Sequence, residues 1–221
     1  MRASLLGLGL VLGFALACGG GSTPAIQTIS QWPCPDCEVT DVDVRGPIAY
    51  IAGGKKGGLV IVDLSDPSAP KELARMPVEG SAISVRVDGT TAYLGVFGKG
   101  GLVTFDVSDP TAPKQLGQHG GGAYFVEKKG DYVFVPGTVY DVSDPSKPER
   151  VAALPGSNGN GAWLEGDTLY VGASTNGFRM VDISDPKAPK LLGEMESKYA
   201  KDAAVKGDFV FVPAQNDKVV Q

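Results

Sequence analysis

The chain is poor in the residues that metal sites and nucleic-acid surfaces require. Its 221 residues include one histidine and three cysteines, and 20 Lys and Arg stand against 25 Asp and Glu, a net charge of −5. A zinc site takes Cys and His ligands, and the one close pair of cysteines lacks two further partners of this kind. An acidic chain without a Lys/Arg stripe gives no electrostatic reason to expect nucleic-acid binding. We therefore expect no metal, no cofactor and no nucleic-acid partner.

The chain also lacks an apolar run of the length that an ordinary membrane span needs. Its longest run, ASLLGLGLVLGFALA, follows Arg2 and has the length of a signal-peptide h-region. The sequence therefore predicts a signal peptide over residues 1–17. The junction Ala17-Cys18, followed by GGGSTP, resembles the bacterial lipoprotein cleavage site, although Ala15 stands where such sites usually carry leucine.

This resemblance implies that Cys18 receives a lipid and that residues 18–25 form a flexible tether. Several acyl chains on one cysteine hold a domain on a membrane far better than a single chain does. Gly19 after the lipidated cysteine is compatible with sorting to the outer membrane. The expected location is thus the cell envelope, with the membrane as a partner. The alternative is simple secretion after cleavage near Ala17.

Cys34 and Cys37 remain, in the segment PCPDCE. Haem attachment needs a histidine directly after the second cysteine, where Glu38 stands, and a redox pair needs a helix N-terminus that the flanking prolines disfavour. In an exported protein such a pair is typically oxidised. We expect a structural disulfide.

The most informative feature is a repeat that ends in the motif D-x-S-D-P. Its first aspartates, at positions 63, 106, 141 and 182, are 43, 35 and 41 residues apart, and 31 glycines punctuate the chain. A period near forty with strand patterns and no helix is typical of a β-propeller of four-stranded antiparallel blades. We expect an all-β propeller over residues 26–221 with about five units, at about 39–78, 82–119, 123–155, 161–197 and, incomplete, 202–221.

The fifth unit ends before its D-x-S-D-P turn and fourth strand. The N-terminal segment AIQTISQWP precedes the first unit in the place of a fourth strand. Since an incomplete ring exposes sheet edges, we expect this strand to complete the fifth blade and close the ring. The alternative is a shortened version of a larger propeller whose ring does not close.

The strand LVIVDLSDPSAP and its copies resemble the LVIVD repeat of bacterial and archaeal exported proteins. The resemblance covers residues 39–221. It implies a β-propeller in an exported, surface-associated setting, and it supplies no agreed catalytic residues.

The candidate site lies on the face that collects the glycine-rich loops, because binding residues are usually carried on loops held by a rigid scaffold. Alignment of the first strands places carboxylates and aromatics near the mouth of the central channel. The candidate ligand-binding residues are Asp41, His119, Phe125, Trp163, Tyr199 and Asp202. They suit a peptide or a sugar. The alternative is that the loops are merely solvated and the aromatics plug the axis.

These observations favour a binding module for a protein or glycan partner, without catalysis. The competing hypothesis is a hydrolase or lyase that uses Asp41 and Asp202 as a carboxylate pair. A hydrogen-bonding role for these aspartates is favoured, and there is no G-x-S-x-G motif to go with the single His119. A structural envelope component or a remnant of a longer gene is a third alternative.

Overall fold

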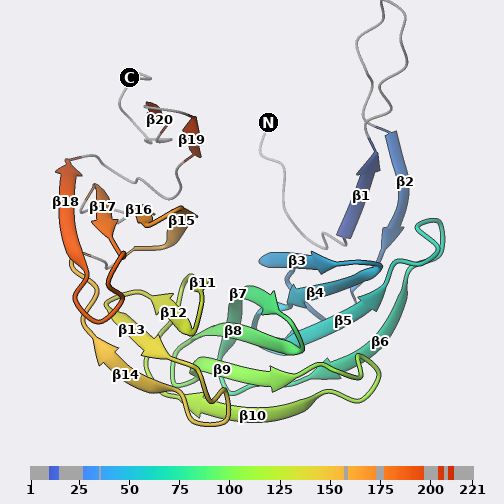
Figure 1. The fold of residues 1–221 in the computed structure, drawn as a ribbon. Coiled ribbons are helices and arrows are strands. Elements are labelled where there is room, and N and C mark those ends of the chain that lie inside the picture. The colour runs from blue at the N-terminus through green and yellow to red at the C-terminus, as the bar shows by residue number, and fades with distance from the viewer. Residues whose placement is uncertain are drawn as a thin grey trace, which may run out of the picture.

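The computed structural model describes residues 10–14, 27–34, 36–156, 159–172, 177–196, 204–206 and 209–211. Within these ranges it contains four sheets of four consecutive antiparallel strands. Figure 1 shows the sheets following one another along an arc, with the first strand of each nearest the centre. This is a β-propeller in which each sheet is one blade, as the repeat predicts.

Blades one and two come first along the chain. Blade one contains β3 (Asp41–Arg45), β4 (Ile48–Ala52), β5 (Leu59–Asp63) and β6 (Lys71–Met76). Blade two contains β7 (Ser81–Asp88), β8 (Thr91–Phe97), β9 (Gly101–Asp106) and β10 (Lys114–His119). Between β4 and β5, where the sequence predicts a plain loop, lies the one-turn helix α1 (Gly54–Gly57), closed by a 3.0 Å bond from the Gly57 amide to the Gly53 carbonyl.

Blades three and four follow, and the strands of blade three are the shortest of the four blades. Blade three contains β11 (Glu127–Lys129), β12 (Tyr132–Val135), β13 (Thr138–Asp141) and β14 (Glu149–Ala152). Blade four contains β15 (Gly161–Glu165), β16 (Thr168–Gly172), β17 (Phe178–Asp182) and β18 (Lys190–Met195). Two-stranded pairs stand outside the blades: β1 (Leu10–Phe14) with β2 (Gln27–Trp32), and β19 (Ala204–Lys206) with β20 (Phe209–Phe211).

The apolar third strand of each blade serves two interfaces. In β5, Leu59 and Ile61 point into the cluster shared with blade two, whereas Val60 and Val62 point into a cluster on the opposite face. Successive side chains of a strand point to opposite faces, and because both faces of this strand are buried, every residue of the run is apolar. Equivalent clusters lie between blades two and three and between blades three and four.

The free face of blade one is covered by the segment before it. Trp32, Cys34 and Val39 pack on this face beside Val60 and Val62. In the described residues, β2 pairs with β1, and no ladder joins β2 to β19 or β20. Within the described residues, the predicted closure of blade five by residues 26–32 is therefore not shown. Leu10–Phe14 lies within the predicted signal peptide, residues 1–17, so its pairing with β2 belongs to the uncleaved chain.

The D-x-S-D-P motif forms a double turn on the side of the blade away from the glycine-rich loops. In blade one, Asp63 accepts the Ser65 amide at 2.8 Å, and Asp66 accepts the Ser68 amide at 2.9 Å. The Asp66 carbonyl then accepts the Ala69 amide, with proline at the second turn position. The same bonds recur in the other three blades. The repeated motif is thus a structural connection between the third and fourth strands.

These turns predict acid sensitivity. Hydrogen bonds from Ser or Thr two residues on lower the pKa of seven motif aspartates. A lowered folded-state pKa adds stability above the unfolded value of about 3.9 and loses it as the pH falls through the folded value. We expect the free energy of unfolding in urea to drop between pH 5 and pH 3. In Ser65→Ala the Asp63 pKa, followed by NMR, should rise toward its ordinary value; an unchanged pKa would contradict this account.

Candidate binding site

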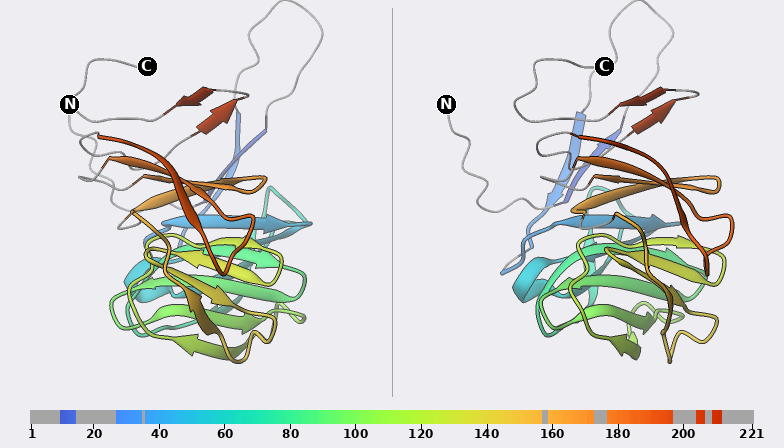
Figure 2. Two further views of the ribbon diagram at one scale, coloured as in Figure 1. Left: turned by 60° about the vertical axis from the view of Figure 1, so that its left-hand side comes forward. Right: turned by 90° about the vertical axis from the view of Figure 1, so that its left-hand side faces the viewer.

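The loops that join second to third strands share one face with the loops that enter the next blade. Gly54, after β4, forms a bridge with Ala82 of β7, and the Ala123 amide donates to the Val96 carbonyl at the end of β8. For the loops of blades one and two and the segments that enter blades two and three, this arrangement confirms the predicted grouping. We call this surface the loop face. In Figure 2 the strands of neighbouring blades run between it and the opposite face of D-x-S-D-P turns.

Asp41 does not present a free carboxylate to the channel. Its Oδ2 accepts hydrogen bonds from the Ser84 hydroxyl at 2.9 Å, the Val85 amide at 3.1 Å and Arg86 Nη1 at 2.9 Å. All three donors come from β7, the first strand of the next blade. Asp41 therefore joins blade one to blade two, as the hydrogen-bonding interpretation of the sequence predicts.

Arg86 continues this connection into blade three. Its Nη2 lies 2.8 Å from Oε1 of Glu127, whose residue is only 8% exposed. Burial raises the pKa of Glu127, and the neighbouring Arg86 charge opposes the rise. Burial alone lowers the pKa of Arg86, but Glu127 and Asp41 outweigh it, so the net shift is upward. One cation thus lies between two carboxylates of different blades, and we call Asp41, Arg86 and Glu127 the axial ion network.

Other first-strand side chains cap the inner sheet edge of the next blade. Asp43 accepts the Val87 amide at 2.7 Å, and the Ser84 hydroxyl accepts the Val126 amide at 3.2 Å. Innermost strands have one unpaired edge, so these side chains satisfy amides that would otherwise lack protein partners. In blade four the corresponding positions hold Gly161 and Trp163, which have no carboxylate or hydroxyl.

The remaining predicted site residues fall into different environments. Phe125 is 3% exposed in the core between blades three and four, so it packs rather than faces a ligand. Trp163 on β15 is 48% exposed. Tyr199 and Asp202 lie outside the described residues, and so does Cys18. The proposed pairing of Asp41 with Asp202 therefore has no counterpart in the described part of the chain.

His119, at the end of β10, lines a pocket of about 290 Å³ between blades two and three. Its Nδ1 lies 2.9 Å from the Tyr140 hydroxyl and 3.1 Å from the Gly120 carbonyl. Burial raises the pKa of Tyr140, partly opposed by the Arg150 charge, so the phenol stays protonated. Sequence reasoning found His119 but missed Tyr140 and Arg150, since they follow in the next repeat and only the fold brings them to the pocket.

An exposed aromatic pair lies next to this pocket. Phe97 and Tyr124 are 46% and 36% exposed, and their ring centroids are 4.8 Å apart. They come from the end of β8 and the loop before β11, both on the loop face. Phe97 was not predicted as a site residue. The feature that could have identified it is an aromatic residue inside the glycine-rich segment GVFGKGG.

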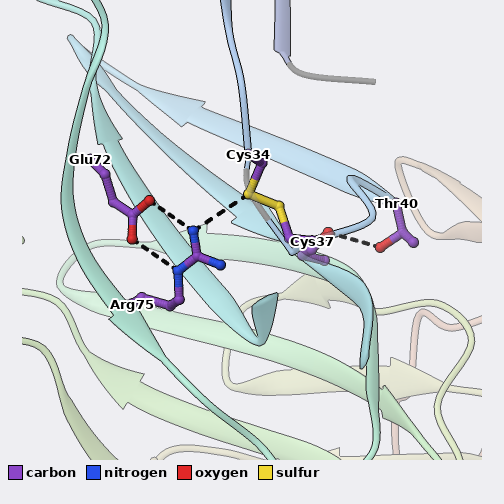
Figure 3. The surroundings of a disulfide bond; sticks show 6 residues. Cys34, Cys37, Thr40, Glu72 and Arg75 are labelled. Carbon is purple, nitrogen blue, oxygen red and sulfur yellow. Dashed lines mark hydrogen bonds and ion pairs between the residues drawn. A yellow bond between two sulfur atoms is a disulfide. The ribbon is translucent and has the colours of Figure 1, made fainter. Parts of the chain in front are cut away.

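A disulfide joins Cys34 and Cys37, whose Cα atoms are 5.5 Å apart. Figure 3 shows Arg75 of β6 between this disulfide and Glu72. Arg75 Nη2 lies 3.6 Å from Cys34 Sγ and 2.8 Å from a Glu72 oxygen. The disulfide thus closes a short loop within the N-terminal segment, and Arg75 links this loop to blade one.

The described residues include no cluster of three or more His, Cys, Asp or Glu side chains arranged to hold a metal ion. Nor do they include a helix with the length and apolar character of a membrane span.

The five repeats match a family model described as the LVIVD repeat, at residues 37–76, 79–118, 120–152, 158–196 and 197–220. The chain belongs to the LVIVD repeat family. No curated protein matches it. In the LVIVD repeats of this chain, the signature strand supplies core residues and a turn, whereas the pocket and the aromatic pair come mainly from loops. Family membership therefore accounts for the fold and leaves the ligand open.

Solved structures share this fold at low sequence identity. A functionally unknown protein from Desulfotomaculum acetoxidans is 12% identical with a TM-score of 0.67, covering 86% of this chain and 66% of its own. A protein from Lactobacillus plantarum is 14% identical with a TM-score of 0.69, covering 94% and 75%. The computationally designed Ika8 protein is 15% identical with a TM-score of 0.68, covering 85% and 59%. The chain thus spans less than two thirds of the first and last of these three, and the likeness shows the fold alone.

The axial ion network predicts a specific pattern of stability. Arg86→Met leaves two carboxylates without their cation, so it should lower the free energy of unfolding by about 1.5–3 kcal/mol. Adding Glu127→Gln should restore part of this loss, because the buried negative charge is removed. The measurement is urea denaturation at pH 7.

The matched control is Arg45→Met, which removes the exposed pair with Asp43. An exposed ion pair of this kind contributes about 0.2–1 kcal/mol. Equal losses for Arg86→Met and Arg45→Met would show that the axial network is no more than a surface feature.

Proposed function

We propose that this protein is an exported, lipid-anchored propeller that binds a protein or glycan partner at the cell envelope and performs no catalysis. The observation that carries the proposal is the pair Phe97–Tyr124, which exposes two aromatic rings on the loop face beside a pocket. Exposed aromatics on loops of a rigid scaffold are typical of recognition surfaces, since they offer large contact area at low entropic cost.

The state of the axial carboxylates favours binding over hydrolysis. A glycoside hydrolase needs two carboxyl groups free to act on one bond. Asp41 is engaged by three donors from β7, and Glu127 is held by Arg86. These groups are used to join blades.

The proposed location rests on the N-terminal sequence and on the disulfide. Arg2, the apolar run and Cys18 form a lipoprotein-type signal. A Cys34–Cys37 disulfide suits an oxidising compartment outside the cytosol. The proposed setting is the outer membrane, with the loop face available to partners.

The aromatic pair can be tested by capture. Binding partners are crosslinked in intact cells with the anchor retained, and purified envelope proteins and a glycan array are screened in parallel. The double variant Phe97→Ala, Tyr124→Ala should lose most of the captured partner, about tenfold or more, because hot-spot aromatics contribute 2 kcal/mol or more each. Trp163→Ala tests the channel rim separately.

The control is Leu192→Ala, which removes an exposed apolar side chain on the outer strand β18. Loss of capture in this variant as well, or retention in the aromatic variant, would contradict the assignment of the loop face.

The proposed lipid anchor at Cys18 can be tested by its effect on membrane association. Cys18→Ala should abolish incorporation of labelled fatty acid and move the protein from the membrane fraction to the soluble fraction. Cys34→Ala, which breaks only the disulfide, should leave lipid labelling intact. Unchanged membrane association in Cys18→Ala would exclude lipidation as the means of attachment.

A further inference from the structure

The pocket between blades two and three is lined by a cation and by no acidic side chain, in contrast to the acidic chain as a whole. Its lining residues include Arg150 and His119 and no Asp or Glu, although the chain as a whole carries a net charge of −5. A carboxylate-free concavity with a cation attracts an anion.

Arg150 has no carboxylate partner among the described residues. The adjacent Glu149 is paired with Lys147 at 3.0 Å, and Arg150 is exposed. Its one described electrostatic neighbour is the Tyr140 hydroxyl. The guanidinium is therefore available, and its planar fork matches a carboxylate with two parallel hydrogen bonds.

The inner wall of the pocket is formed by residues of blades two and three that contact one another. Tyr140 is buried at 4% exposure, and its hydroxyl contacts His119 Nδ1, which is also near the Gly120 carbonyl. In the described residues nothing bonds to Nε2 of His119, so either tautomer leaves this nitrogen for a ligand. The close approach of β9 requires glycine: at Gly101, φ is +66° and a Cβ would lie 2.1 Å from the His119 carbonyl oxygen.

The pocket adjoins the aromatic pair. Gly122 lines the pocket, and a Cβ at this position would lie 3.7 Å from Phe97 Cδ2. A ligand whose charged group lies at Arg150 can therefore place an adjoining ring near Phe97 and Tyr124. The volume of about 290 Å³ is at the lower end for small-molecule sites, which suits one sugar residue.

We propose that this pocket binds the carboxylate of an acidic sugar, a hexuronate unit of a glycan, through Arg150 and His119. The inference rests on the proposed binding function and specifies its ligand class. A uronate carries an apolar C–H face and a carboxylate on one ring, which matches an aromatic surface next to a single unpaired cation. Thr138, whose side chain also bonds Tyr140, and residues 120–122 line the pocket where the hydroxyl groups of the sugar would lie.

The test is calorimetric titration of the purified full-length protein with galacturonate trisaccharide. The wild type should bind, and the galactose trisaccharide, which has a hydroxymethyl group in place of each carboxylate, should bind at least about tenfold more weakly. Arg150→Gln should weaken uronate binding by about tenfold or more, and Arg150→Lys should have an intermediate effect because it keeps the charge and loses the fork. Lys114→Gln, which removes an exposed charge at the start of β10, is the matched control and should bind as the wild type does.

Three results would overturn the inference: no uronate binding by the wild type, equal binding by Arg150→Gln, or tighter binding of a tetra-aspartate peptide than of the uronate. Thermal unfolding of Arg150→Gln at the wild-type temperature verifies that the exposed substitution leaves the fold intact. Failure here and failure of the proposed function are distinguishable. If partner capture still depends on Phe97 and Tyr124 while uronate does not bind, the binding function stands and the acidic-sugar assignment falls.

Discussion

A blade of this propeller has two apolar faces, and water would contact both if the blade stood alone. Packing against neighbours removes them, and each fully buried Val, Leu or Ile contributes on the order of 1.5–3 kcal/mol before conformational entropy opposes it. The apolar clusters that alternate along β5 and β9 are the direct result. The ends of the array need the same protection. At blade one, Trp32 and Cys34 provide it; at blade four, Val210 of β20 packs against Phe178.

Polar groups near the axis follow from the same radial arrangement. Innermost strands converge and leave one backbone edge unpaired, so side chains of one blade bind the amides of the next, as Asp43 does with Val87. Arg86 lies where carboxylates from blades one and three approach, and it neutralises both. Lys128, which interrupts an otherwise apolar column of the repeat, has a similar explanation: it reaches back to Asp88 at 2.9 Å. Charge near the channel is therefore used to align blades.

The sequence was more informative about repeated features than about unique ones. The D-x-S-D-P turns, the doubly buried third strand and the grouping of loops on one face could all be predicted, because each occurs several times and the copies support one another. Single residues were harder. Aromatic character alone does not distinguish the buried Phe125 from the exposed Trp163, since the repeat aligns both with the start of a first strand, although Phe125 precedes β11 and Trp163 lies on β15. Arg150 and Tyr140 had no motif to identify them.

The sequence by itself determined the blade, its period and its connecting turns, since strand alternation and turn chemistry are local and are written in consecutive residues. Only the tertiary structure decided which side chains meet between blades. Asp41 and Glu127 are 86 positions apart, and His119 and Tyr140 are in different repeats, so their contacts depend on the rotation from one blade to the next. That rotation is set by how the apolar faces fit together, a property of packed volumes that no single repeat contains.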